Sequence, residues 1–202
     1  VNIMGASKRI MEDVIMAYRD KFNVTTARFA NVAFSNGSLP AGFIDRLMKK
    51  QPLAAPSDVR RYFVSPEESG QICMLACMLG ENGEIFFPKL GEEDMMTFSF
   101  ICDKFLSDLG YTKKECKTAE EAKQYAAEMP EGSRIYPVCY SKSDTNGEKG
   151  FEEFYVHGEK LNMNRFKSLG VIEAKAKRSM EEVNSFFEKM ENLFSDSDVS
   201  KQ

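Results

Sequence analysis

The chain has 202 residues, of which 43% are hydrophobic and 29% charged, the mixture of an ordinary globular protein with a sizeable core. A formal net charge of -4 argues against a broad nucleic-acid-binding surface, and no apolar run approaches membrane-spanning length. Five cysteines, an odd number without a CxxC pair, argue against a disulfide framework or a zinc site. We therefore expect a cytoplasmic protein without a bound metal.

Helical and strand patterns alternate through the first 110 residues, which predicts an α/β fold. Apolar residues at helical spacing predict amphipathic helices, and short β-branched or aromatic runs predict strands. Ser65 and Glu68 form a capping box, and Pro52 and Pro56 are expected to break the chain. The expected helices are 4–22, 40–50, 66–79 and 97–109, and the expected strands are 24–29, 61–64 and 84–87.

The pattern becomes mixed α+β after Tyr111. We predict helices at 119–129 and 177–194, a strand at 134–140, a polar loop at 141–150 and an edge strand at 151–156. Three parts are therefore expected, namely 1–115, an extension over 116–174, and a C-terminal helix with its tail over 175–202. The single histidine, His157, lies in a polar stretch and is expected at the surface.

Cysteine and methionine side chains in the predicted helices have structural interpretations. Cys73 and Cys77, one helical turn apart, are expected to be small buried residues rather than metal ligands. The methionines are expected in the core or at a subunit interface, and they are Met4, Met11, Met16, Met74 and Met78.

Three ordered blocks of residues carry the functional signal. The first is Asn-Ile-Met-Gly-Ala-Ser-Lys-Arg at 2–9, the second Arg-Phe-Ala-Asn-Val at 28–32 followed by Ser-Asn-Gly-Ser at 35–38, and the third Arg-Tyr-Phe-Val-Ser-Pro-Glu at 61–67. Over about 1–115 they resemble the extended short-chain dehydrogenase/reductases that act on nucleotide sugars. Within these they resemble the polysaccharide-biosynthesis (CapD-like) 4,6-dehydratases, which include UDP-N-acetylglucosamine 4,6-dehydratase.

Met4 and Lys8 are four residues apart and share one helical face. By resemblance, Lys8 is the lysine that holds the cofactor ribose, and Met4 occupies the catalytic position where most short-chain dehydrogenases have a tyrosine. A thioether cannot exchange a proton, so the resemblance assigns acid/base work to residues outside this chain. The alternative for Lys8 is an ordinary solvated lysine.

The resemblance also implies contacts to a UDP-sugar substrate. Asn31 would approach the nucleotide-sugar, while Asn36 and Ser38 lie in a loop that could surround a diphosphate with backbone amides. Arg61 is the candidate for gripping the diphosphate, because guanidinium binds phosphate bidentately, and Arg60 should point the other way in an extended segment. Asn31 could instead stabilise its own turn, and Asn36 and Ser38 could belong to an ordinary turn.

The implied fold is the C-terminal half of an extended short-chain dehydrogenase/reductase (Rossmann-type) fold, with its substrate-binding subdomain and an added α+β extension. The implied reaction oxidises the sugar at C4 with tightly bound NAD or NADP, eliminates water across C5 and C6, and returns the hydride to C6. The chain has no Gly-x-Gly-x-x-Gly after a strand, so residues 1–202 alone are expected not to bind NAD(P) measurably. The apolar stripe of the first helix is expected to join a second copy of the chain.

Two other functions are compatible with the same residues. A UDP-sugar 4-epimerase would share Lys8, Asn31 and Arg61. A non-catalytic sugar-nucleotide-binding or assembly protein would have Met4 as the mark of a lost active site.

Overall fold

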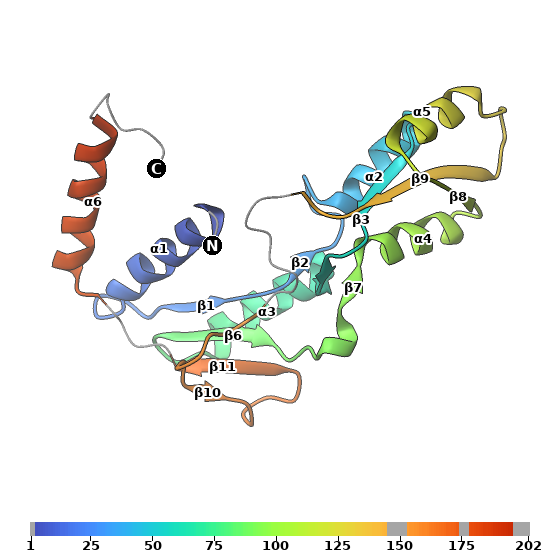
Figure 1. Ribbon diagram of the computed structural model, residues 1–202. Helices are drawn as coiled ribbons and strands as arrows, with labels where there is room; N and C mark the ends of the chain where they lie inside the picture. The colour runs from blue at the N-terminus through green and yellow to red at the C-terminus, as the bar shows by residue number, and fades with distance from the viewer. Residues whose placement is uncertain (1–2, 145–152, 174–177, 196–202) are drawn as a thin grey trace. The chain divides into compact units, whose positions relative to one another are not determined.

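A computed structural model describes residues 3–144, 153–173 and 178–195 (Figure 1). The chain forms two compact units. The first unit takes its described residues from 1–28, 73–87 and 155–202, and the second from 29–72 and 88–154. No helix in the described part of the chain is long and apolar enough to cross a membrane.

The first unit is built on a four-stranded sheet with strand order β1-β6-β11-β10. β1 runs parallel to β6, and β10 pairs with β11 in antiparallel register (Figure 1). The strands are β1 (Thr25–Ala27), β6 (Glu84–Pro88), β10 (Leu161–Asn162) and β11 (Leu169–Glu173). Every residue of β6 is buried, as expected for a strand covered on both faces.

Close packing in this sheet depends on a glycine in β11. A Cβ atom at Gly170 would lie 2.2 Å from the ring of Phe87, a buried residue of β6. Real Cβ atoms do not approach other heavy atoms so closely, so only glycine lets the Phe87 ring lie against this strand.

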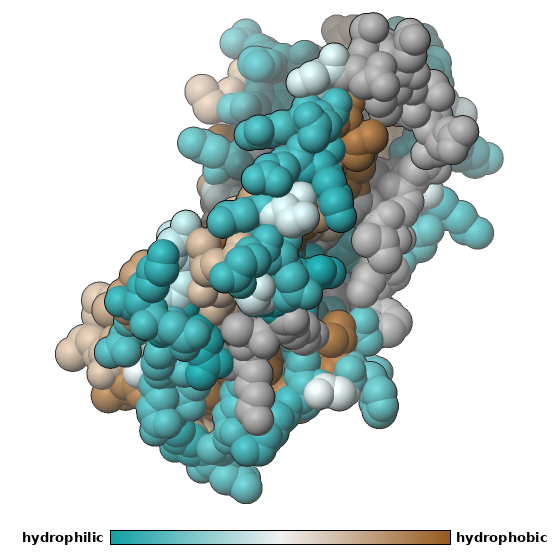
Figure 2. Space-filling model, turned by 90° about the vertical axis from the view of Figure 1, so that its left-hand side faces the viewer, coloured by the Kyte–Doolittle hydropathy of each residue, from teal (hydrophilic) through white to brown (hydrophobic). Residues whose placement is uncertain are grey.

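Helices α1 (Ile3–Ala17) and α6 (Met180–Ser195) belong to the first unit, together with the C-terminal part of α3 (Pro66–Leu79). α6 packs against α1, with Val183 buried. The face of the molecule in Figure 2 is largely hydrophilic with hydrophobic patches among the polar residues, and α6 itself leaves Phe187 and Phe194 exposed.

The second unit is built on a three-stranded parallel sheet with strand order β3-β9-β8. Its strands are β3 (Leu53–Pro56), β8 (Thr112–Cys116) and β9 (Ile135–Ser141), and its helices are α2 (Leu39–Met48), α4 (Phe98–Asp108) and α5 (Ala119–Glu128). Two small ladders complete it. β2 (Asn31–Val32) runs parallel to β5 (Phe63–Val64), and β4 (Arg60–Arg61) is antiparallel to β7 (Met96–Thr97), which follows the short 3-10 helix η1 (Glu92–Asp94).

The core of the second unit lies where α2 and α4 pack on β3. Its buried side chains are Phe43, Leu53, Ala55, Cys102, Leu106, Tyr136 and Val138. Burial raises the pKa of the Cys102 thiol to about 11, so this cysteine is an inert, neutral core residue at neutral pH.

Capping residues place the helices where the sequence predicts them. The Ser65 hydroxyl accepts a hydrogen bond from the Glu68 N–H at 3.0 Å, and the Glu68 carboxylate accepts one from the Ser65 N–H at 2.6 Å. The Thr97 and Thr118 hydroxyls cap α4 and α5 by accepting from the Phe100 and Glu121 N–H groups, each at 3.1 Å. The first helix ends at Ala17, five residues early, because hydrogen bonds there change to an i to i-3 pattern.

Several strand predictions are wrong. The segment between Pro52 and Pro56, expected to be a break, forms β3, since a proline at the end of a strand removes no essential ladder bond. β8 was not predicted, because four of its five side chains are exposed and carry no apolar alternation. Residues 153–156 form no strand, and the rest of the predicted edge strand lies outside the described residues.

The predicted division at residue 115 falls inside β8. Strands of the predicted extension are distributed over both units, because β9 joins β3 and β8 while β10 and β11 join β1 and β6. The segment is therefore integral to both sheets.

Candidate functional site

Met4 and Lys8 lie on consecutive turns at the start of α1, in the first unit. Both side chains are exposed, Met4 to 67%. The Ser7 hydroxyl donates to the Met4 carbonyl at 2.9 Å, which occupies one backbone acceptor of this turn. No described residue forms an ion pair with Lys8, so its three N–H donors are available to the hydroxyl groups of a ligand. Such exposure is common to a ribose-holding lysine and to an ordinary solvated lysine.

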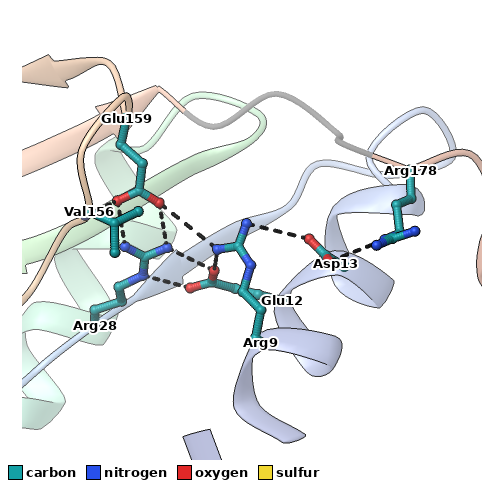
Figure 3. A network of polar contacts seen from close by, with 7 residues as sticks. All are labelled: Arg9, Glu12, Asp13, Arg28, Val156, Glu159 and Arg178. Carbon is teal, nitrogen blue, oxygen red and sulfur yellow. Dashed lines mark hydrogen bonds and ion pairs between the residues drawn. The ribbon is translucent and has the colours of Figure 1, made fainter. Parts of the chain in front are cut away.

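The middle of α1 belongs to a network of charged side chains centred on Arg28 (Figure 3). Arg28 donates to Glu12 from Nε at 2.7 Å and from Nη2 at 2.8 Å. It also donates to Glu159 from Nη1 and Nη2, both at 2.9 Å. One guanidinium therefore makes paired bonds to two carboxylates, the strongest geometry available to this ion pair.

A second arginine and an outer pair complete the network. Arg9 Nη1 donates to Glu12 at 2.9 Å and lies 3.9 Å from Glu159. Asp13 lies 3.7 Å from Arg9 and 3.6 Å from Arg178, which precedes α6 (Figure 3). The positive and negative charges of these six side chains balance, so the cluster carries no net charge.

Burial and hydrogen bonding act in opposite directions on these groups. Burial alone would lower the pKa of Arg28, but the hydrogen bonds to Glu12 and Glu159 outweigh it and raise that pKa. Burial alone would raise the pKa of Glu159, but hydrogen bonds from Arg28 and the Val156 N–H outweigh it and lower that pKa. Arg28 and Glu159 are therefore both ionised at neutral pH.

Asn31 and Arg61 lie close together in the second unit. Asn31 begins β2, and both its backbone N–H and its side-chain Nδ2 donate to the carbonyl of Tyr62, at 3.2 and 3.4 Å. Arg61, the neighbour of Tyr62, is only 7% exposed and donates from Nη1 to the Arg60 carbonyl at 2.9 Å. Arg60 points the opposite way and is exposed, as the extended backbone predicts.

Asn36 and Ser38 lie in the turn before α2. Gly37 between them has φ +77°, a left-handed conformation that favours glycine. Ser38 is the N-cap of α2, and its hydroxyl accepts from the Ala41 N–H at 3.3 Å. The turn thus presents an exposed amide, that of Asn36, beside a helix N-terminus, an arrangement suited to an anion.

Other sequence expectations have mixed outcomes. The predicted burial of Cys73 and Cys77 is wrong, because both lie on a face of α3 that the described residues leave exposed. Of the five methionines, only Met16 is buried; the others are exposed. His157 is exposed, as predicted. The sequence does not single out Glu159. A carboxylate in a polar stretch gives no local sign of a partner such as Arg28, which lies 131 residues away in the chain.

Comparison with known proteins identifies the family. The family model described as "Polysaccharide biosynthesis protein" matches residues 1–172. The chain belongs to this polysaccharide biosynthesis family. The match continues well beyond residue 115, where the resemblance was expected to end, so most of the predicted extension lies within the family region.

Individual relatives share part of this chain. The capsular polysaccharide biosynthesis protein CapD of Staphylococcus aureus is 26% identical over 158 residues, 76% of this chain and 25% of CapD. A UDP-glucose 4-epimerase of Rickettsia bellii (strain OSU 85-389) is 30% identical over 95 residues, 44% of this chain and 28% of the epimerase. The chain therefore spans about a quarter of the length of each.

A solved structure shows the same fold. The X-ray structure of Pen from Bacillus thuringiensis superposes with a TM-score of 0.63 at 19% identity, covering 87% of this chain and 49% of that chain. This likeness and the parallel strand pairs described above show that the chain has a Rossmann-type α/β fold, as predicted.

Proposed function

We propose that this chain is the C-terminal half of a nucleotide-sugar 4,6-dehydratase that acts on UDP-N-acetylglucosamine in polysaccharide or amino-sugar biosynthesis. The observation that carries the proposal is at the start of α1. An exposed Lys8 lies there one turn after Met4, which has no proton-transferring group. The relationship to CapD, a capsular polysaccharide biosynthesis protein, supports the polysaccharide part of the proposal. The whole protein, under this proposal, is the present chain joined to a dinucleotide-binding half.

The proposal includes a tightly bound NAD or NADP, which would accept a hydride from the sugar and later return it. From this chain, Lys8 would bind the ribose hydroxyls. Met4, beside it, cannot move a proton and would contribute only apolar surface. Proton transfer at the sugar is left to side chains outside these 202 residues.

Four residues of the second unit would bind the UDP-sugar. Arg61 would bind the diphosphate through its guanidinium, and Asn31 would offer its amide to the nucleotide-sugar. Asn36 and Ser38 would place the exposed turn before α2 against the phosphates. The exposed Met11 and Ile15 on α1 support self-association through that helix.

A UDP-sugar 4-epimerase is the second candidate, because the 30% identity to the Rickettsia epimerase covers nearly half of this chain. Both reactions would use Lys8, Asn31 and Arg61. They differ in whether water is lost after oxidation at C4.

Product analysis separates these functions. The whole protein is incubated with UDP-N-acetylglucosamine and the product is followed by NMR. We expect a 4-keto-6-deoxy sugar, which also shows whether C5 is inverted. Conversion to the galacto isomer would establish an epimerase instead, and binding without turnover would establish a sugar-nucleotide-binding protein or a different substrate.

Adjacent arginines provide a matched test of the substrate site. Arg61→Lys in the whole protein should weaken UDP binding about 10- to 100-fold, because an ammonium cannot reproduce the bidentate contact of a guanidinium. Arg60→Lys should leave the affinity within about twofold, since Arg60 is exposed and donates to the Glu92 carbonyl at 3.0 Å. Calorimetric titration with UDP measures both, and circular dichroism verifies folding. Equal weakening by the two substitutions would remove Arg61 from the site.

A further inference from the structure

The Arg28 network links the C-terminal part of the chain to the helix that carries Lys8. Glu12 lies one turn after Lys8 on α1, and its carboxylate accepts both bonds from Arg28. Arg28 follows β1 directly, and its backbone N–H donates to the Phe86 carbonyl at 2.8 Å. The guanidinium is therefore attached to the sheet, and the position of α1 along that sheet depends on where Arg28 holds Glu12.

Glu159 completes the orientation of this guanidinium. Its carboxylate accepts from Nη1 and Nη2 of Arg28, and its Oε2 also accepts from the Val156 N–H at 2.9 Å. The side chain of Glu159 is only 8% exposed. Because a planar guanidinium bonded along two edges cannot rotate without breaking both pairs, Glu159 fixes the direction in which Arg28 meets Glu12.

The segment that carries Glu159 is itself anchored in the first unit. The Glu159 N–H donates to the Val156 carbonyl at 3.2 Å, closing a turn, and the Glu173 N–H donates to the Lys160 carbonyl at 2.9 Å. Lys160 leads into β10, which pairs with β11. A continuous path of contacts thus runs from the β10–β11 hairpin through Glu159, Arg28 and Glu12 to the start of α1.

We propose that Glu159 is a positioning residue for the reaction: through Arg28 and Glu12 it holds α1 where Lys8 meets its ligand. The inference rests on the proposed function. It gives a role to the segment around residue 159, which the sequence motifs left without one. Glu159 itself touches no reacting group, since its carboxylate is occupied by Arg28 and the Val156 N–H.

The ionisation of Glu159 sets the pH range in which this role operates. Its pKa lies below the ordinary value of 4.5, because its hydrogen bonds outweigh the effect of burial. The stabilisation that the Glu159 carboxylate gives to the folded state is therefore complete above pH 4.5. It is lost as the pH falls through the lower pKa of the folded state. Between pH 6 and 8 the effect of a substitution should not change with pH.

Glu159→Gln in the whole protein tests the proposal, with Glu173→Gln as the matched control. Glu173 lies at the end of β11 and pairs only with the exposed Lys160 among the described residues. We expect Glu159→Gln to lower kcat about 10- to 100-fold, since a misplacement of about 1 Å away from the chemistry can cost a factor of about 100. KM for the UDP-sugar should stay within about twofold, because the proposed substrate residues belong to the second unit. Glu159→Asp, which keeps the charge, should recover part of kcat.

Amide hydrogen exchange on the 202-residue chain gives a second readout that needs no turnover. Residues 3–17 should exchange about tenfold faster in Glu159→Gln and at the wild-type rate in Glu173→Gln, because only the first substitution releases α1. An unchanged kcat in a folded Glu159→Gln variant that is merely less stable would overturn the positioning role. If the wild-type protein has no turnover, the proposed function fails. The amide exchange rates of residues 3–17 then decide by themselves whether Glu159 positions α1, and unchanged rates in Glu159→Gln overturn the inference.

Discussion

Replacing Phe43 with alanine should lower the free energy of unfolding of the second unit by about 3–5 kcal/mol, the usual cost of emptying a fully buried aromatic site. Phe43 is 0% exposed and lies in the core formed by α2, α4 and β3. Its ring centroid is 6.0 Å from that of Phe105. Since small domains are stable by only about 5–15 kcal/mol, this single truncation should move the unit close to its unfolding threshold.

The neighbouring residue of α2 is the control. Ile44 is 40% exposed, so Ile44→Ala should cost less than about 1 kcal/mol. Urea denaturation followed by far-UV circular dichroism compares the stability of the variants. Tyrosine fluorescence gives a second unfolding signal, because the chain has no tryptophan to obscure it. If the two substitutions had equal effects, the described core would be incorrect.

Replacing Lys8 with methionine should reduce kcat of the whole protein about 100-fold and weaken its retention of NAD(P). Hydrogen bonds from a charged donor are worth about 1.5–3 kcal/mol each, which corresponds to a factor of about 10–150 in rate or affinity. Lys8 is exposed, and no described residue pairs with its ammonium, so its loss should remove ligand contacts without unfolding α1. Turnover of UDP-N-acetylglucosamine and the fraction of protein isolated with bound dinucleotide measure the effect.

A lysine outside the proposed site serves as the control for charge removal. Lys104 is exposed on α4 and forms an i,i+4 pair with Asp108 at 2.7 Å. Lys104→Met should leave kcat within about twofold, since an exposed helical pair contributes only about 0.3–0.5 kcal/mol to stability. Full activity of Lys8→Met would show that Lys8 is an ordinary solvated lysine.

Local sequence signals predicted the helices well. Ser65 caps α3 as expected, because a cap depends only on a side chain and the backbone three residues away. The α/β class also followed from the alternation of local patterns. The spacing of Met4 and Lys8 placed them on consecutive turns of one helix, since four residues make about one turn.

Strand pairing and the charged network depended on contacts between distant residues. β3 and β8 carry little strand pattern of their own and are strands because β9 lies between them. Cys73 and Cys77 look like core residues in sequence, yet the face of α3 that carries them is exposed.

The family blocks, the capped helices and the helical turn that presents Lys8 can all be predicted from sequence, because each depends on residues within a few positions of one another. Which strands pair, and which carboxylates meet Arg28, follow from the folded chain alone. Glu12 and Glu159 reach that guanidinium from separations of 16 and 131 residues. A charged residue in a polar segment has the same local sequence pattern whether it is solvated or buried, because its partner comes from a distant part of the chain.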